Sequence, residues 1–210
     1  MHRTKIVKFF KTLREINPNP QTELHFDSPF QLLIAVILSA QATDKSVNLA
    51  TEKLFKCAPN AFKMKELGEY HIKRFIQKIG LYQNKAKNIY RTCEILCEKY
   101  NGDIPKTFEE LIKLPGVGRK TANVVLNTAF GYSTMAVDTH IFRVANRTGM
   151  APGKTVLEVE KGLLNRIPLF YLKNAHHWLI LHGRYICKAR NPLCETCPVS
   201  DCCDFFKNPR

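Results

Sequence analysis

Leu111-Ile-Lys-Leu-Pro-Gly-Val-Gly-Arg-Lys-Thr-Ala122 is the stretch of sequence that most clearly indicates the fold of this chain. Pro115 is expected to end one helix and Gly118 to precede a second, so the two glycines permit a tight turn around Val117. Such a turn leaves backbone N–H groups at the positive end of the second helix, where a phosphate can bind without any contact to a base. Gly116, Val117 and Gly118 are therefore candidate contacts to nucleic acid, although an ordinary connection between two helices fits the same residues.

The rest of the sequence carries helix signals and little that indicates a strand. Ser28–Gln31 combines an N-cap serine, a proline at the first helical position and a glutamine three residues after the cap. Thr107–Glu110 and Thr155–Glu158 repeat the capping-box pattern, and Gly131 and Gly149 stand where C-terminal caps are expected. An almost entirely helical protein is therefore predicted.

The composition is that of a folded and strongly basic protein. With 210 residues, of which 45% are hydrophobic, the chain can bury a core, which excludes a disordered tail and a disulfide-stapled miniprotein. Thirty-two Lys and Arg residues against 18 Asp and Glu residues give a net charge of +14 at pH 7. This charge favours a polyanionic partner such as nucleic acid, although it is also compatible with a protein that is merely soluble and basic.

The sequence indicates neither a secretion signal nor a membrane span. Residues 1–11 interleave apolar and basic side chains, which is not the pattern of a signal peptide. The longest apolar stretch, from Phe30 to Ala42, contains polar residues and is shorter than the roughly 20 residues that cross a bilayer, so it predicts a buried helix. We therefore expect a cytoplasmic protein whose cysteines stay reduced.

Four cysteines near the end of the sequence have the spacing of a metal site. Cys187, Cys194, Cys197 and Cys203 follow the pattern C-x6-C-x2-C-x5-C, which is too compact for four independent core residues. Four thiolates can hold zinc or an iron–sulfur cluster, and the single C-x2-C knuckle disfavours zinc without excluding it. Cys202 could take the place of Cys203 as the last ligand.

Two basic residues lie inside this cysteine loop. Lys188 and Arg190 stand between its first two cysteines and could contact a DNA backbone, or they could be ordinary solvated charges. The remaining cysteines, Cys57, Cys93 and Cys97, are isolated and are interpreted as packing residues.

Lys120 is a candidate nucleophile because of its place after the glycine turn. A helix from residue 119 would put Lys120 in the first turn, at the edge of a polar face with Arg119, Asn123 and Asn127. The positive end of that helix disfavours an ammonium group, as an amine nucleophile requires. A helical lysine taken alone is more commonly a solvated charge.

Asp138 is a candidate catalytic carboxylate and also a predicted N-cap of the helix from Thr139 to Thr148. A helix from residue 120 to 130 advances about 15 Å, and the eight steps to residue 138 can span up to about 26 Å. The chain is therefore long enough for Asp138 to return to Lys120.

Together these motifs resemble the bacterial endonuclease III family over nearly the whole chain. The segments that carry the resemblance are Ser39–Asp44, Ile79–Tyr82, Leu114–Ala122, Val137–His140, His177–Arg184 and the four-cysteine loop. The resemblance implies an all-α, monomeric protein of two helical domains flanking a DNA-binding cleft, with double-stranded DNA carrying a damaged pyrimidine or an abasic site as its partner.

The resemblance also implies where the domains lie. One domain would span residues 21–132 and contain a helix-hairpin-helix motif at about 108–130. The other would combine residues 1–20 and 133–210 and hold a structural [4Fe-4S] cluster on the four cysteines of the loop 187–203.

The activity implied by the resemblance is base-excision repair. Lys120 matches the family's nucleophile and Asp138 its catalytic carboxylate, so the enzyme would remove oxidised or damaged pyrimidines from duplex DNA as an N-glycosylase. It would then cleave the abasic strand by β-elimination, as an AP lyase, through a Schiff base on the lysine. Gln41 and Leu81 match residues that fill the space left by the flipped nucleotide.

Two other functions fit parts of the sequence. A monofunctional adenine-type mismatch glycosylase shares the fold and the cluster, but it lacks a lysine at the position of Lys120 and carries an additional C-terminal domain. A non-catalytic helix-hairpin-helix DNA-binding protein, or a redox protein with a cluster, would need neither Lys120 nor Asp138.

Overall fold

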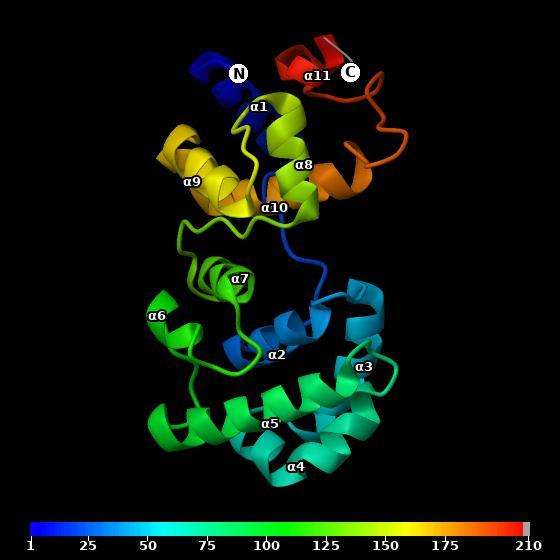
Figure 1. Ribbon diagram of the computed structural model, residues 1–210, viewed down its shortest axis with the longest axis vertical. Coiled ribbons are helices and arrows are strands. Elements are labelled where there is room, and N and C mark those ends of the chain that lie inside the picture. Colours follow the sequence, from blue (N-terminus) through cyan, green and yellow to red (C-terminus); the bar gives the residue numbers. More distant parts are fainter. Residues whose placement is uncertain (208–210) are drawn as a thin grey trace. The chain divides into compact units, whose positions relative to one another are not determined.

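The computed structural model of the protein describes residues 1–207, and these residues form helices and connecting loops with no strand among them (Figure 1). They divide into two compact units. Residues 23–130 form the first, called here the hairpin unit, and residues 1–22 with the chain from 131 onward form the second, called the cysteine unit. Each boundary lies two residues from the position that the sequence suggested.

Helix α2 is the centre of the hairpin unit. The helices of this unit are α2 (Pro29–Ser39), α3 (Asp44–Cys57), α4 (Ala61–Ile76), α5 (Tyr82–Lys99), α6 (Phe108–Leu111) and α7 (Arg119–Phe130). Every residue from 30 to 38 of α2 is buried, and α3, α5 and α7 pack against it. The predicted core helix is confirmed, with Ser28 as its N-cap. No helix in residues 1–207 is long and apolar enough to cross a membrane.

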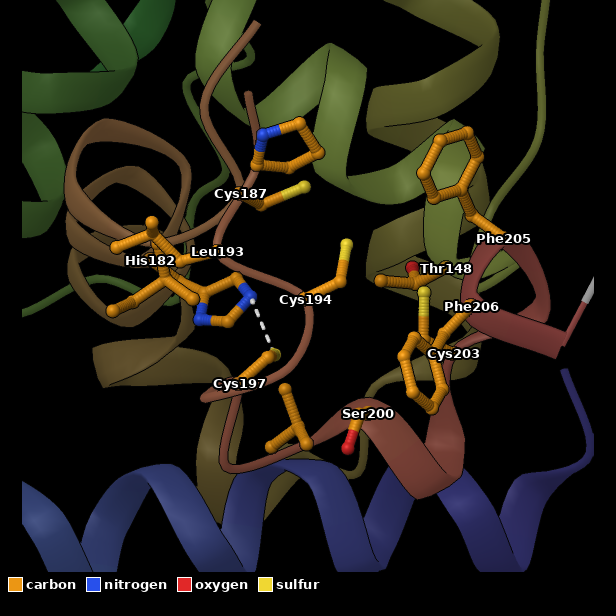
Figure 2. A pocket seen from close by; sticks show the side chains of 13 residues that line it. Thr148, His182, Cys187, Leu193, Cys194, Cys197, Ser200, Cys203, Phe205 and Phe206 are labelled. Atoms are coloured by element: carbon orange, nitrogen blue, oxygen red, sulfur yellow. Dashed lines mark hydrogen bonds between the residues drawn. The ribbon is translucent and has the colours of Figure 1, made fainter. Parts of the chain in front are cut away.

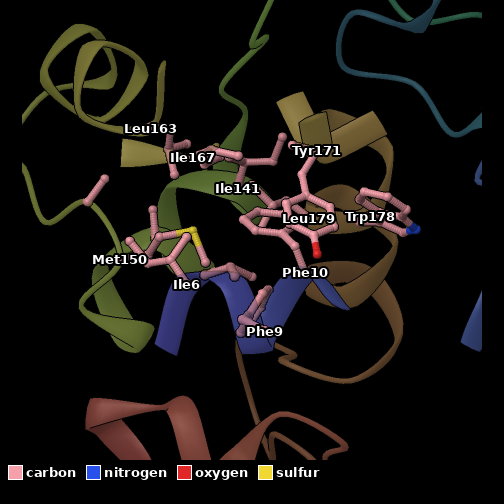
Figure 3. Packing of buried hydrophobic residues seen from close by; sticks show 14 of the residues in the cluster. Ile6, Phe9, Phe10, Ile141, Met150, Leu163, Ile167, Tyr171, Trp178 and Leu179 are labelled. Atoms are coloured by element: carbon pink, nitrogen blue, oxygen red, sulfur yellow. The ribbon is translucent and has the colours of Figure 1, made fainter. Parts of the chain in front are cut away.

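The cysteine unit is built around an aromatic core. Its helices are α1 (Arg3–Ile16), α8 (Thr139–Thr148), α9 (Val156–Arg166), α10 (Leu169–Tyr185), the 3-10 helix η1 (Ser200–Cys202) and α11 (Asp204–Lys207). Phe10 of α1 stacks on Tyr171 of α10 with ring centres 5.8 Å apart, and Trp178 lies beside both (Figure 3). The indole N–H of Trp178 donates to the carbonyl of Asn17, 2.8 Å away, so this aromatic side chain is buried with its polar atom paired.

The helix caps that the sequence indicates are present. Thr107 and Thr155 are the N-caps of α6 and α9. Gly131 and Gly149 have φ angles of 71° and 70°, the left-handed conformation that ends a helix and favours glycine. The carboxylate of Glu158 accepts from the backbone N–H of Lys154 over 2.8 Å, just before the cap residue.

A buried histidine makes the cysteine unit sensitive to acid. His177 of α10 is 7% exposed, and burial lowers its pKa to about 4. Because an unfolded chain gives histidine a pKa of about 6.5, the unfolded state binds more protons than the folded state between these two pH values. Protonation of His177 therefore does not reduce the free energy of unfolding above about pH 6.5. As the pH falls from 6.5 toward 4, the free energy of unfolding decreases, by about 2 kcal/mol between pH 7 and pH 5.

We predict that the midpoint of thermal unfolding falls between pH 7 and pH 5, and that His177→Gln reduces this fall because glutamine does not titrate. The comparison is between the two pH values within each protein, so a change of absolute stability in the variant does not affect it. An equal fall in both proteins would contradict the assignment to His177.

Candidate nucleic-acid interface and metal centre

The glycine hairpin before α7 is packed against the rest of its unit at Gly116. This residue has φ 79°, and a Cβ atom placed on it would lie 3.1 Å from the side chain of Asn88 on α5 and 3.4 Å from Ile37 on α2. The hydroxyl of Thr92 donates to the carbonyl of Pro115 over 2.9 Å. The left-handed backbone conformation therefore favours glycine at 116, and a Cβ atom there would fit only if the side chain of Asn88 moved by a few tenths of an ångström.

The other side of the hairpin is open. A Cβ atom on Gly118 would meet nothing within 4 Å, and the carbonyl of Gly118 accepts the first helical bond of α7, from Ala122. Val117 between the glycines is buried, which fixes the hairpin to the core. The first backbone N–H groups of α7 have no acceptor within the helix. This open helix start has the geometry at which a phosphate can approach the backbone.

Lys120 is an exposed residue in the first turn of α7, as Arg119 is. The predicted polar face does not continue along the helix, because Asn123 and Asn127 are each 5% exposed. That prediction is wrong for a physical reason: α7 is surrounded by protein after its first turn, and helical periodicity cannot distinguish a buried amide from an exposed one. Lys120 is therefore presented at the end of a buried helix.

Asp138 is the N-cap of α8, as predicted. One oxygen of its carboxylate accepts from the backbone N–H of Ile141 over 2.8 Å, and its carbonyl accepts from Phe142. Ile141 is fully buried, so the cap is anchored in the core, while Asp138 itself is half-buried. The candidate nucleophile and the candidate carboxylate thus come from different units of the chain, each at the N-terminus of a helix.

The cysteine unit brings four thiols around one pocket. Cys187, Cys194, Cys197 and Cys203 all line a space of about 360 Å³, part of which is open to solvent (Figure 2). Cys202 does not line this pocket. It is 1% exposed and belongs to the hydrophobic core of the unit. The structure therefore distinguishes the two adjacent cysteines, which the spacing alone could not do.

The remaining lining of the pocket is largely apolar. It consists of Thr148, His182, Ile186, Pro192, Leu193, Val199, Ser200, Phe205 and Phe206. In residues 1–207 no three His, Cys, Asp or Glu side chains are grouped as for a single metal ion. Thiolates in an apolar, partly closed site suit an iron–sulfur cluster, in which each cysteine binds a different iron atom. The residues present therefore fit a [4Fe-4S] cluster.

Two arginines of α8 hold the beginning of the cysteine loop. The Arg147 guanidinium donates to the carbonyls of Lys188 and Ala189 at 2.6 and 3.0 Å and lies 3.7 Å from the sulfur of Cys187. Arg143 donates to the carbonyl of Cys187 over 2.9 Å. Neither arginine could be identified from the sequence, because their partners lie about forty residues away and no local pattern marks the contact.

The basic residues of the loop remain exposed. The side chains of Lys188 and Arg190 are open to solvent, while the backbone between Cys187 and Ala189 is fixed by the bonds described above. The loop therefore presents two cations from a restrained backbone.

A second buried histidine, His182, lies at the cysteine pocket and could not be assigned to it from the sequence. Nε2 of His182 lies 3.9 Å from the sulfur of Cys197 (Figure 2), and burial lowers the pKa of His182 to about 4, so its ring is neutral near pH 7. Burial also raises the pKa of the Cys197 and Cys203 thiols. A bound iron would have to replace these thiol protons.

Gln41 and Leu81 lie in neighbouring turns of the hairpin unit. Their φ angles are 56° and 59°, a left-handed conformation that is strained for side chains of this kind. The carbonyl oxygen of Gln41 is 3.9 Å from the place that a Cβ atom on Gly80 would occupy. Leu81 is 60% exposed. The structure thus brings these two candidate residues together at one edge of the unit.

Comparison with known proteins identifies the family. The model of the HhH-GPD superfamily of base excision DNA repair proteins matches residues 34–169. The chain is 57% identical to endonuclease III of Escherichia coli K12, over 98% of this chain and 97% of that protein. It is 58% identical to endonuclease III of Rickettsia conorii, over 96% of each. The chain belongs to the endonuclease III family.

Solved structures agree with this membership. A trapped covalent intermediate of endonuclease III with DNA superposes with a TM-score of 0.91 at 43% identity, covering 99% of this chain and 98% of that one. A non-covalent endonuclease III–DNA complex gives the same TM-score at 44% identity, over 99% and 97%. The protein is accordingly an all-α base-excision repair enzyme, a DNA glycosylase and AP lyase that acts on duplex DNA, as the sequence resemblance implied.

Replacing Gly116 and Gly118 by alanine, one at a time, should show which glycine matters for stability and which for DNA binding. We predict that Gly116→Ala lowers the free energy of unfolding by about 1 to 2 kcal/mol, because alanine is strained in the left-handed backbone conformation of this residue. Gly118→Ala, which meets open space, should keep its stability and bind duplex DNA less tightly, because the added methyl group obstructs a phosphate. Denaturant unfolding and fluorescence anisotropy measure the two quantities. Equal loss of stability in both variants would refute this division.

Proposed function

We propose that the enzyme removes oxidised pyrimidines from duplex DNA and cleaves the resulting abasic strand, with Lys120 as nucleophile and Asp138 as the catalytic carboxylate. The observation that carries this proposal is the exposed lysine in the first turn of α7, directly after the open glycine hairpin. A phosphate bound at the hairpin would bring the sugar of a neighbouring nucleotide toward this amine. The protein would work as a monomer in the bacterial cytoplasm.

The chemistry assigned to Lys120 is covalent. The damaged base must first leave the stack. The free amine of Lys120 then attacks C1′ of the sugar, and the bond from C1′ to the base breaks, so that the base leaves with the bonding electrons and takes up a proton. Opening of the sugar ring gives a Schiff base. Its positive charge makes the C2′ proton acidic, and loss of that proton expels the 3′ phosphate by β-elimination. The trapped covalent endonuclease III–DNA intermediate of a 43% identical relative supports this route.

Asp138 is assigned an electrostatic or proton-transfer role. A carboxylate near the sugar stabilises the positive charge that develops as the base leaves, or it assists the transfer of the amine proton. The bond from Ile141 holds one carboxylate oxygen of Asp138 in place, which fixes the direction of the group. A fixed charge needs no reorganisation during the reaction.

Four cysteines, Cys187, Cys194, Cys197 and Cys203, are proposed to hold a [4Fe-4S] cluster with a structural role. When bound, the cluster would cross-link the two ends and the middle of the loop 187–203 and supply no step of the base removal. Lys188 and Arg190 on the same loop would then contact DNA phosphates. Gln41 and Leu81 are proposed to enter the duplex where the damaged nucleotide leaves it, since a polar and an apolar side chain suit the two sides of that gap.

The covalent step can be tested by borohydride reduction on duplex DNA with one oxidised pyrimidine. We predict a covalent protein–DNA band for the wild type and none for Lys120→Ala, because the variant lacks the amine assigned to the Schiff base. Lys113→Ala removes an exposed lysine just before the hairpin and should keep the band.

The same assay tests Asp138. Asp138→Asn keeps an N-cap acceptor and loses the charge, so its covalent band should form more slowly than that of the wild type.

The other outcomes assign other functions. A band in Lys120→Ala would refute the nucleophile. Release of the base by the wild type without any band would mean a monofunctional glycosylase that uses water. If no base is released, the protein would be a DNA-binding protein or would act on a different lesion.

Cysteines 202 and 203 form a matched pair for testing the cluster. We predict that Cys203→Ser lowers the iron content and the visible absorption of the purified protein, because its thiol lines the pocket. Cys202→Ser should keep both, since Cys202 lies in the hydrophobic core. If Cys202→Ser loses iron and Cys203→Ser keeps it, Cys202 is the fourth ligand instead of Cys203. Full iron content in both variants would refute the assignment of Cys203 as a ligand.

A further inference from the structure

Lys85 of α5 is a buried cation that the proposed chemistry does not use. It is 6% exposed, and its ammonium group donates to the carbonyls of Leu38 and Ala40 at 2.9 and 2.6 Å. Lysine is almost never buried unless it is paired. No ion pair to Lys85 occurs in residues 1–207, so its partners are main-chain oxygens of the segment that ends α2. Burial lowers the pKa of Lys85.

The C-terminal end of α2 provides a favourable site for the ammonium group of Lys85. The last carbonyls of a helix have no partners within the helix and carry its partial negative charge. The hydroxyl of Ser39 donates to the carbonyl of Val36, and the backbone N–H of Ala42 donates to the carbonyl of Ser39. Lys85 satisfies the carbonyls of Leu38 and Ala40. The backbone leaves the helix at this point and enters its left-handed turn at Gln41.

The first turn of α5 connects Lys85 to the neighbouring turn at Leu81. Leu81 is the N-cap of α5 in a left-handed conformation and makes no side-chain cap bond. Its carbonyl accepts from the backbone N–H of Lys85 over 3.1 Å, which is the ordinary first hydrogen bond of the helix and does not depend on the side chain at 85. One residue therefore bonds to the turn of Leu81 through its backbone and to the residue before Gln41 through its side chain.

These two turns are unusual within the described chain. Residues other than glycine with positive φ in residues 1–207 are Gln41, Leu81, Asn101 and Asn191. Asparagine tolerates this conformation, whereas leucine and glutamine are strained in it, and such strain persists only where the surroundings enforce it. Leu81 is also largely exposed, so packing within the protein does not account for it.

We infer that Lys85 is a positioning residue that holds the turns of Gln41 and Leu81 in the conformation in which their side chains enter the DNA duplex. The inference rests on the insertion role proposed above for these two residues. A turn already held in its bound conformation loses less conformational freedom on binding, so more of the binding free energy is available to extrude the damaged nucleotide.

The test compares Lys85→Met with Lys87→Met, which removes an exposed lysine of the same helix. In single-turnover assays on duplex DNA with a paired lesion, Lys85→Met should be slower by about tenfold or more, as expected for misplaced groups near a reacting centre. Lys87→Met should behave like the wild type. Cleavage of a preformed abasic site in single-stranded DNA needs no insertion, so Lys85→Met should retain it.

Two further measurements separate positioning from general damage. A lesion placed in a bulge is already partly extruded, so the defect of Lys85→Met should shrink on that substrate, whereas a misfolded enzyme would fail on every substrate.

In a double-mutant cycle, Lys85→Met should add little to the loss of rate caused by Gln41→Ala combined with Leu81→Ala, because all three substitutions act on one step. Should Lys85→Met fail to fold, Lys85→Gln, which keeps one donor group, is used with the same expectations.

The outcomes also distinguish this inference from the proposed function. If the wild type neither releases the base nor forms the trapped band, the proposed function fails. If the wild type is active and Lys85→Met matches Lys87→Met on paired duplex DNA, or loses single-stranded and duplex cleavage equally, the role of Lys85 is overturned. Full additivity in the double-mutant cycle would also overturn it.

Discussion

A helix with a buried middle must find partners for its last carbonyl groups as well as for its side chains. Helix α2 has nine consecutive buried residues, and at its C-terminal end the chain reaches the surface at Ala40 and Gln41, which are exposed. The ammonium group of Lys85 donates to the carbonyls of Leu38 and Ala40 at this transition from core to surface. The same helix also borders the hairpin, because a Cβ atom on Gly116 would lie 3.4 Å from the side chain of Ile37. The hairpin and the strained turn at Gln41 thus depend on one buried helix.

Helix α8 has a comparable place in the cysteine unit. Asp138 caps its N-terminus, and Arg147 in its last turn binds the backbone of the cysteine loop. Ile141 and Val144 between them are fully buried, so both ends belong to one rigid element. The proposed catalytic carboxylate and the proposed DNA-contacting loop are therefore oriented by the same core. Damage to that core would disturb both together.

The features that could be predicted from sequence are those encoded by neighbouring residues. The caps, the central helix, the glycine hairpin and the compact cysteine loop depend on interactions a few residues apart, and the structure has them. The errors and omissions concern contacts between distant segments. Asn123 and Asn127 have a polar pattern but are buried, and the partners of Lys85 and Arg147 lie about forty or more residues away. Distinguishing Cys203 from Cys202 required the pocket itself.

The insertion role proposed for Gln41 and Leu81 would explain why neither strained turn has a glycine. Glycine would adopt the left-handed backbone at 41 and 81 without strain, but it has no side chain to place in a duplex. Leucine supplies an apolar side chain and glutamine a polar one, each with a conformational penalty of order 1–3 kcal/mol. Such a conformation persists only if the surrounding structure enforces it. The positioning role that we infer for Lys85 would supply this constraint, through its side-chain bond to the carbonyl of Ala40 and the first helical bond of α5 to Leu81.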